Sequence, residues 1–222
     1  MIVAINHPYL FPYAGYFRLM RHADVFVALD SAQFPRRGFV HRNKLLDVNG
    51  VPRWLTIPLR KQSRDVLIKD LEYAGDAREL LKKQIYRFPA LSNPYNGVSA
   101  WANRFLDLAE SPVEFILSGL RWVNTQLDIS TPIVRSSELG IDSSLRGQDR
   151  ILAILSHYGA SEYVNAPGGR DLYDGDEFRR RNIQLRFLRH YEGDHSSILQ
   201  LLANRSVDSV VQELESQILW QT

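Results

Sequence analysis

An apolar run, an amphipathic segment and a second apolar run open this chain, and their order constrains its fold more than any other feature. Residues 1–6 are largely apolar over the length of a strand, and residues 25–29 form a second such run. Residues 13–22 between them are amphipathic and as long as a short helix. Because two buried strands joined by a helix pair in parallel, the sequence predicts a β-α-β unit.

The remainder of the chain predicts further strands and helices. Asn49-Gly50 separates the apolar-rich runs 42–48 and 51–58, which is the strongest short signal of a β-hairpin. Apolar residues at helical spacing predict helices over residues 76–88, 98–109, 113–127 and 149–157. Short strands are expected at 133–134, 163–165 and 183–188, and a helical tail that includes Ile218 is expected at 196–220.

These elements together predict an α/β fold. We expect a Rossmann-like parallel-sheet core that starts with the β-α-β unit, an inserted β-hairpin with helical segments, and a helical C-terminus. Repeats, low-complexity tracts and linkers are absent from the sequence, so we expect one domain over residues 1–222.

Composition excludes several classes of protein and site. The 222 residues include no cysteine, which excludes disulfides, thiolate nucleophiles and zinc–sulfur sites. The net charge of +2 gives no indication of nucleic-acid binding. No segment has the about 20 uninterrupted apolar residues of a membrane span. The first residues lack a basic leader and a long apolar stretch, so we expect a cytoplasmic protein.

The first candidate cluster follows the first strand, at the edge of a parallel sheet where ligands bind. His7 leaves that strand just ahead of a helix, where backbone N–H groups and the helix dipole favour an anion and imidazole adds a donor. Tyr9 and Tyr16 belong to the same aromatic-rich segment. The alternative interpretation is a structural loop with packed aromatic rings.

A second cluster follows the second strand. Asp30 ends that strand, so we expect it to neighbour His7. Arg36-Arg37 offers forked donors that match phosphate or carboxylate groups. Gln33 precedes this pair, and His41, Arg42 and Asn43 follow it. The alternative is a solvated basic loop.

The third cluster follows the strand at 163–165. Gly168-Gly169 permits a ligand to approach the backbone closely, and Tyr173 lies a few residues farther on. An ordinary turn is the alternative for this double glycine. The Walker, Gly-x-Ser-x-Gly and His-Glu-x-x-His motifs are all absent from the sequence. We predict no metal; a metal site made by His7, Asp30 and His41 is the less favoured alternative, and no cofactor is indicated.

With these residues in view, the chain resembles the WbqC-like family. The matching segments follow one order within residues 2–199: Ile5-Asn6-His7-Pro8-Tyr9-Leu10-Phe11-Pro12-Tyr13-Ala14-Gly15-Tyr16-Phe17, Asp30, Gln33-Phe34, Arg37-Gly38, Arg42-Asn43, Trp54-Leu55-Thr56-Ile57-Pro58, Ser136-Ser137-Glu138-Leu139, Gly168-Gly169, Leu172-Tyr173, Phe178 and Ser196-Ser197-Ile198-Leu199. The chain departs from the family at His7, where glutamine is expected in many members.

The resemblance implies a transferase of surface-polysaccharide (O-antigen-type, lipopolysaccharide) biosynthesis that transfers an N-acyl or aminoacyl group to a nucleotide-linked amino sugar. His7 or Asp30 would take the amine proton, and an acyl-carrier protein is one donor that the resemblance allows. The arginines would hold a diphosphate, and aromatic rings would stack on the sugar or base. The residues expected to bind this substrate are Tyr9, Tyr16, Gln33, Arg36, Arg37, His41, Arg42, Asn43, Trp54, Gly168, Gly169 and Tyr173.

Two other functions stay open from the sequence. Residues 11–23 are similar to the first helix of HIGH-type nucleotidyltransferases, with His7 near the first histidine of that motif and Gly15 at its glycine. Tyr16 stands at the position of the second histidine of that motif. A tyrosine cannot carry the positive charge that this histidine brings to a leaving phosphate. A non-catalytic protein that binds a glycan precursor is the third possibility. The oligomeric state is not indicated by the sequence.

Overall fold

The computed structural model describes residues 1–217 and residue 220. Its centre is a five-stranded, all-parallel sheet in the order β5-β2-β1-β6-β7. The strands are β1 (Ile2–Asn6), β2 (Val25–Ala28), β5 (Ile133–Arg135), β6 (Glu162–Asn165) and β7 (Gln184–Phe187). The α/β class, the Rossmann-like core and the opening β-α-β unit predicted from the sequence are confirmed.

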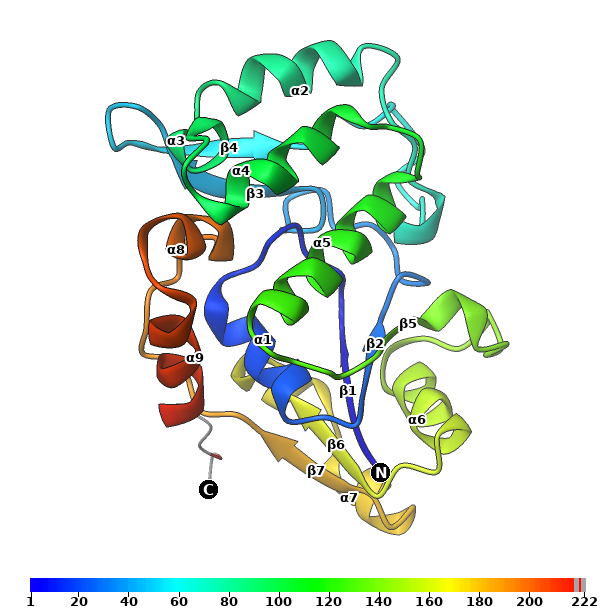
Figure 1. Ribbon diagram of the computed structural model, residues 1–222. Helices are drawn as coiled ribbons and strands as arrows, with labels where there is room; N and C mark the ends of the chain where they lie inside the picture. Colours follow the sequence, from blue (N-terminus) through cyan, green and yellow to red (C-terminus); the bar gives the residue numbers. More distant parts are fainter. Residues whose placement is uncertain (218–219, 221–222) are drawn as a thin grey trace.

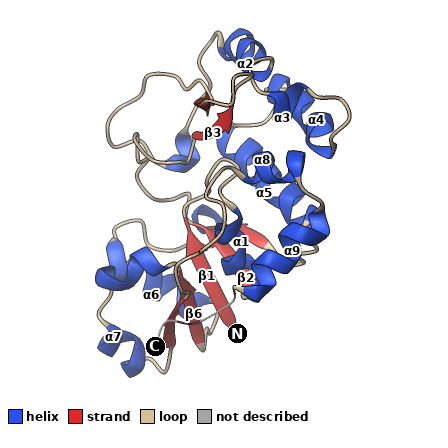
Figure 2. Cartoon of the chain, turned by 90° about the vertical axis from the view of Figure 1, so that its left-hand side faces the viewer, coloured by secondary structure: helices blue, strands red, loops and turns tan. Residues whose placement is uncertain are grey.

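Helices cover both faces of the sheet, as buried parallel strands require. Successive side chains of a strand point to opposite faces: Ala4 and Phe26 belong to one apolar cluster, and Val3 and Val25 belong to the other. The first cluster includes residues of α1 (Ala14–Arg21), α5 (Pro112–Gln126) and α9 (Val207–Ser216). The second includes residues of α6 (Gly147–His157) and α7 (Gly175–Arg180). Figure 2 shows the sheet between these two groups of helices.

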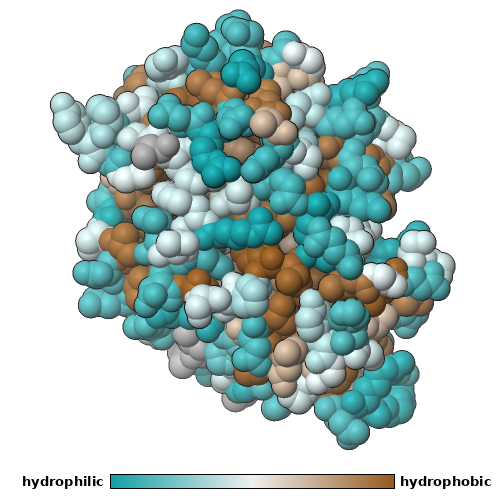
Figure 3. Space-filling view, turned by 45° about the vertical axis from the view of Figure 1, so that its right-hand side comes forward, coloured by the Kyte–Doolittle hydropathy of each residue, from teal (hydrophilic) through white to brown (hydrophobic). Residues whose placement is uncertain are grey.

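An inserted segment lies between β2 and β5 in the sequence. It contains the predicted hairpin, β3 (Arg42–Leu46) and β4 (Pro52–Thr56), in which Gly50 has a φ of +73°. Helical turns follow: η1 (Ile68–Asp70), α2 (Ala77–Ile85), α3 (Pro89–Ser92), α4 (Gly97–Ala102) and η2 (Asn103–Leu106). The carboxyl edge of the sheet faces this segment, which lies at the top of Figure 1. In Figure 3 an apolar patch, surrounded by polar residues, lies at this upper end.

Several predicted helix boundaries are wrong. The expected helix 98–109 is α4 followed by the 3-10 turn η2. The helical tail consists of α8 (Ile198–Asn204) and α9, because Ser206 begins a new helix by accepting a hydrogen bond from the Ser209 N–H. Trp220 forms an antiparallel bridge with Leu188 instead of continuing the tail, and Ile218 lies outside the described residues. Helix α7 was not predicted. Among the described residues, no helix is both long and apolar enough to cross a membrane.

Candidate functional site

A crevice of about 400 Å³ opens at the carboxyl edge of the sheet, where β1 and β6 lie side by side. The chain leaves these two neighbouring strands in opposite directions along the sheet, towards β2 and towards β7, so this is the point where the strand order reverses. We call it the strand-edge crevice. The loop after β1, the first turns of α1 and the turn after β6 line it, with His7, Tyr9, Tyr16, Gly168, Gly169 and Tyr173 among the lining residues.

His7 lines this crevice, and hydrogen bonds hold its backbone on both sides. Its N–H donates to Asn6 Oδ1 at 2.8 Å, and its carbonyl accepts a hydrogen bond from the Tyr16 hydroxyl at 2.7 Å. Burial lowers the pKa of His7 below its ordinary value of 6.5. The imidazole is therefore neutral at pH 7 and has a nitrogen lone pair that accepts a proton.

Aromatic rings form one wall of the strand-edge crevice. The Tyr9 ring lies 6.2 Å from His7 and 5.6 Å from Tyr16, measured between ring centroids. Tyr16 is buried, and desolvation raises its pKa well above 10. Tyr16 therefore brings no charge to the crevice, and its hydroxyl serves to hold the loop that carries His7.

The double-glycine turn faces this wall from β6. Asn165, the last residue of β6, accepts a hydrogen bond from the Ala166 N–H at 2.7 Å and donates to the Tyr173 hydroxyl at 3.3 Å. A Cβ at Gly169 would lie 2.5 Å from Asn165 Nδ2, whereas a Cβ at Gly168 would meet nothing within 4 Å. Gly169 is thus required by close packing, and Gly168 leaves open space at the crevice.

Tyr13 and Arg18 are among the lining residues that were not predicted as site residues. Tyr13 is the N-cap residue of α1, and its side chain accepts no hydrogen bond from the helix. The backbone N–H groups of the first turn therefore have no acceptor on the N-cap side chain. Arg18 is 1% exposed, and its guanidinium donates to the carbonyl groups of Gly15, Arg189 and Gln217. An arginine on the apolar face of a short helix was the sequence signal for this structural role.

Asp30 does not line the strand-edge crevice with His7, and its carboxylate is engaged by other partners. Its side chain is fully buried and accepts hydrogen bonds from Arg135 Nε at 2.7 Å and from the Ser136 hydroxyl at 3.0 Å. The Ser137 N–H and hydroxyl add bonds of 2.9 and 2.7 Å. The carboxylate therefore ties the end of β2 to η3 (Ser136–Glu138).

The basic cluster after β2 divides between different places instead of converging on His7. Arg36 donates to the carbonyl groups of Gln62 and Ser63, and Gln33 donates to the carbonyl group of Arg64. His41 lies with Arg36 in a separate crevice of about 360 Å³. Burial, with help from the Arg42 charge, lowers the pKa of His41 to about 4, and its buried Nδ1 has no hydrogen-bond partner among the described residues.

Asn43, Arg42 and Trp54 belong to the hairpin. Asn43 is buried and donates to the carbonyl groups of Leu10 and Phe11 at 3.1 and 2.7 Å, so it holds the loop between β1 and α1. The Arg42 guanidinium lies over the Trp54 ring, 4.3 Å from its centroid. Together with Arg37, the residues Asn43 and Trp54 line another crevice, outside the strand-edge site.

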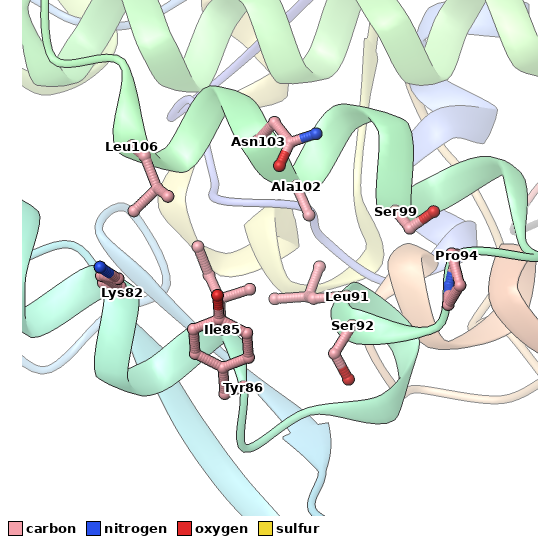
Figure 4. Close-up of a pocket in the computed structure, with 10 residues that line it drawn as sticks. All are labelled: Lys82, Ile85, Tyr86, Leu91, Ser92, Pro94, Ser99, Ala102, Asn103 and Leu106. Carbon is pink, nitrogen blue, oxygen red and sulfur yellow. The ribbon is translucent and has the colours of Figure 1, made fainter.

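A fourth hollow lies between α2 and α4 in the inserted segment. Figure 4 shows Ile85, Leu91 and Leu106 pointing into it, with Lys82 and Tyr86 at its border. None of the residues predicted to bind substrate lines it. Among the described residues, no group of three or more histidine or acidic side chains is arranged to hold a metal ion.

Comparison with known proteins agrees with the resemblance. A model of the WbqC-like protein family matches residues 7–206, which is most of the chain. The chain belongs to this family. It is also similar to an uncharacterized protein of Mycobacterium tuberculosis, with 24% identity over 200 residues that cover 86% of this chain and 83% of that protein. No solved structure matches.

Proposed function

We propose that this WbqC-like protein is a transferase of surface-polysaccharide biosynthesis that acylates the amino group of a nucleotide-linked amino sugar. Membership of the WbqC-like family supports a role in surface-polysaccharide biosynthesis, which the resemblance to this family implies. The observation that carries the chemistry is His7: a neutral imidazole held at the carboxyl end of β1, in a crevice where the strand order reverses.

In the proposed step, the amine lone pair attacks the carbonyl carbon of an activated acyl or aminoacyl donor, and a C–N bond forms. His7 takes the proton that the nitrogen loses and passes it to the leaving group as the carbonyl–leaving-group bond breaks. Backbone N–H groups in the first turn of α1 favour the negative charge that develops on the carbonyl oxygen. Tyr9 and Tyr173 offer ring surfaces to the sugar.

Incubation of the purified protein with nucleotide-linked amino sugars and acyl donors, followed by mass spectrometry, tests the proposal. The expected product carries one added acyl group on the sugar nitrogen. Loss of a general base costs about 10²–10⁴ in rate, so His7→Ala is expected to lower turnover by that range. His190→Ala, which changes an exposed histidine outside the crevice, is the matched control and should keep full turnover.

Three outcomes separate the alternatives. Full turnover by a folded His7→Ala variant refutes the role of His7 as the base. Binding of a nucleotide sugar without product from any donor favours the non-catalytic binding protein. Release of pyrophosphate from a nucleoside triphosphate would favour a nucleotidyltransferase, a reaction for which the uncharged, buried Tyr16 is poorly suited.

A further inference from the structure

The crevice beside the hairpin, which we call the hairpin crevice, is larger than the strand-edge crevice, and its lining residue Asn43 holds the β1–α1 loop. Its volume is about 550 Å³, against about 400 Å³ for the strand-edge crevice. Strand β3, strand β4 and the start of α8 surround it. The proposed transfer step uses none of its residues, although it contains Arg37, Asn43 and Trp54, which the sequence indicated as ligand-binding.

Charge is the first property that indicates its ligand. Arg37, Lys44 and His195 line the hairpin crevice, and none of the described lining residues is acidic. Arg37 and Lys44 are exposed, and neither forms an ion pair with any described residue. The buried Ser196 hydroxyl lacks a hydrogen-bond partner among the described residues. Two unneutralised cations and a spare hydroxyl suit a phosphate-bearing ligand.

Ring surface is the second property. Phe39 is 46% exposed at the border of the crevice, and its ring centroid lies 5.9 Å from that of Trp54. The Lys44 ammonium lies over the Trp54 ring at 5.1 Å, which keeps the cation beside the aromatic surface. A ligand that combines a ring with phosphate groups would cover apolar area and cations together.

The two crevices share a thin wall. Tyr9 lines the strand-edge crevice and packs edge-on against Phe39 of the hairpin crevice, with 6.2 Å between ring centroids. Tyr13 in the first crevice stacks on His195 of the second, with centroids 4.9 Å apart. The two crevices are therefore separated by one layer of packed rings, and a ligand long enough to extend past these rings would contact both.

The strand-edge crevice itself is poor in cations for a diphosphate. Arg18 is the one lysine or arginine among its described lining residues, and its guanidinium already donates to three backbone carbonyl groups. Free cationic donors are instead found across the wall, at Arg37 and Lys44. The free cations thus lie in the hairpin crevice and not in the crevice that His7 lines.

We propose that the hairpin crevice binds the diphosphate and base of a nucleotide-linked sugar, and that the sugar extends past the exposed Phe39 ring towards the strand-edge crevice and His7. Arg37 and Lys44 hold the phosphate oxygens, and Phe39 covers the ring of the base. This inference rests on the proposed function for the identity of the sugar, but the phosphate site is tested independently of any reaction.

Calorimetric titration of the full chain with uridine diphosphate, uridine and inorganic pyrophosphate tests the site. Uridine diphosphate is expected to bind more tightly than either of the other two probes. The double variant Arg37→Gln, Lys44→Gln should weaken its binding at least ten-fold, because two charge-assisted contacts are lost. Lys82→Gln with Arg87→Gln removes the same charge from the exposed surface of the inserted segment and should leave the affinity within two-fold.

The result that overturns the inference is equal affinity for uridine diphosphate in wild type and the Arg37, Lys44 double variant, or equal weakening in both double variants. His7→Ala should bind uridine diphosphate like wild type, because His7 lies in the other crevice. If the hairpin variants lose binding but no acyl donor gives product, the phosphate site stands and the proposed transfer reaction fails.

Discussion

Replacement of Asp30 separates a structural role from a catalytic one. Asp30→Ala removes a fully buried carboxylate and the four hydrogen bonds that it accepts from Arg135, Ser136 and Ser137. Removal of one partner of a buried ion pair costs about 3–5 kcal/mol in free energy of unfolding. Arg135 keeps Glu114 at 2.7 Å and Glu138 at 3.7 Å, so it is not left alone. We therefore expect the lower end, about 3 kcal/mol.

The loss is measured by urea unfolding at pH 7, followed by circular dichroism. For a chain of this size, about 3 kcal/mol corresponds to a melting temperature lower by about 6–12 °C. Asp30→Asn keeps one acceptor oxygen but turns an amide group towards the region of Arg135, so it should fall between wild type and Asp30→Ala. Glu72→Ala is the control: its ion pair with Arg60 is exposed and should contribute less than about 1 kcal/mol.

Wild-type stability in Asp30→Ala would refute this reasoning, since a satisfied buried carboxylate cannot be removed without cost. Wild-type stability combined with lost turnover in Asp30→Asn would instead make Asp30 a group that acts on substrate, as the sequence first indicated.

Three further predictions follow from the site. Burial lowers the pKa of His7, so kcat/KM should fall with decreasing pH at a lower pH than an ordinary histidine would give, and His7→Gln should abolish this fall. The pKa of His41 is lowered to about 4 in the folded protein, so between pH 6.5 and 4 the unfolded chain binds a proton that the folded protein does not. The contribution of His41 to the free energy of unfolding should therefore be fully present above pH 6.5 and decline towards pH 4. His41→Gln should flatten that decline in urea titrations. Gly169→Ala should lower the melting temperature and the transfer activity, because its Cβ would meet Asn165 Nδ2 at 2.5 Å. Gly168→Ala has open space around its Cβ and should change the free energy of unfolding by less than about 0.5 kcal/mol. Equal effects of the two variants would contradict the packing argument.

The fold could be predicted because its signals are local. Strand β1 is buried on both faces over Val3, Ala4 and Ile5, and this produces an unbroken apolar run in the sequence. The Asn49-Gly50 turn is likewise recognisable from the sequence, since Gly50 adopts a positive φ that glycine accepts without strain. Such elements depend on neighbours within a few residues, so composition and spacing suffice to find them.

Helix α7 was not predicted, because charged residues dominate its sequence and obscure the signals of a helix start. The run Arg179-Arg180-Arg181 has no apolar spacing, yet Arg180 and Arg181 both pair with Glu177 on the preceding turn. The Asp174 side chain accepts a hydrogen bond from the Asp176 N–H and begins the helix. Phe178 alone of this short helix is buried, which is too little to create an apolar pattern.

The candidate site was predictable in part, and the reason is geometric. His7 and Gly168-Gly169 come together because β1 and β6 are adjacent parallel strands whose carboxyl ends share an edge. The same rule places Asp30 at that edge but does not give the direction of its side chain. Its partners Arg135, Ser136 and Ser137 are 105 to 107 residues away in the sequence, so no local pattern reveals them.

The β1–α1 loop joins the two crevices, and its anchors come from segments far apart in the chain. Phe11 has a φ of +43°, an unusual value for a bulky residue, and its carbonyl accepts hydrogen bonds from Asn43 at 2.7 Å and from Ser197 at 2.8 Å. The hairpin and the start of α8 therefore hold the loop that carries His7 and Tyr9, and they also line the hairpin crevice. A ligand bound between the hairpin and α8 would contact Asn43, the first of these anchors, and Ser196, which is next to the second. Because the loop is fixed from that side, occupancy of the hairpin crevice should stabilise the position of His7, and this couples the proposed phosphate site to the proposed base.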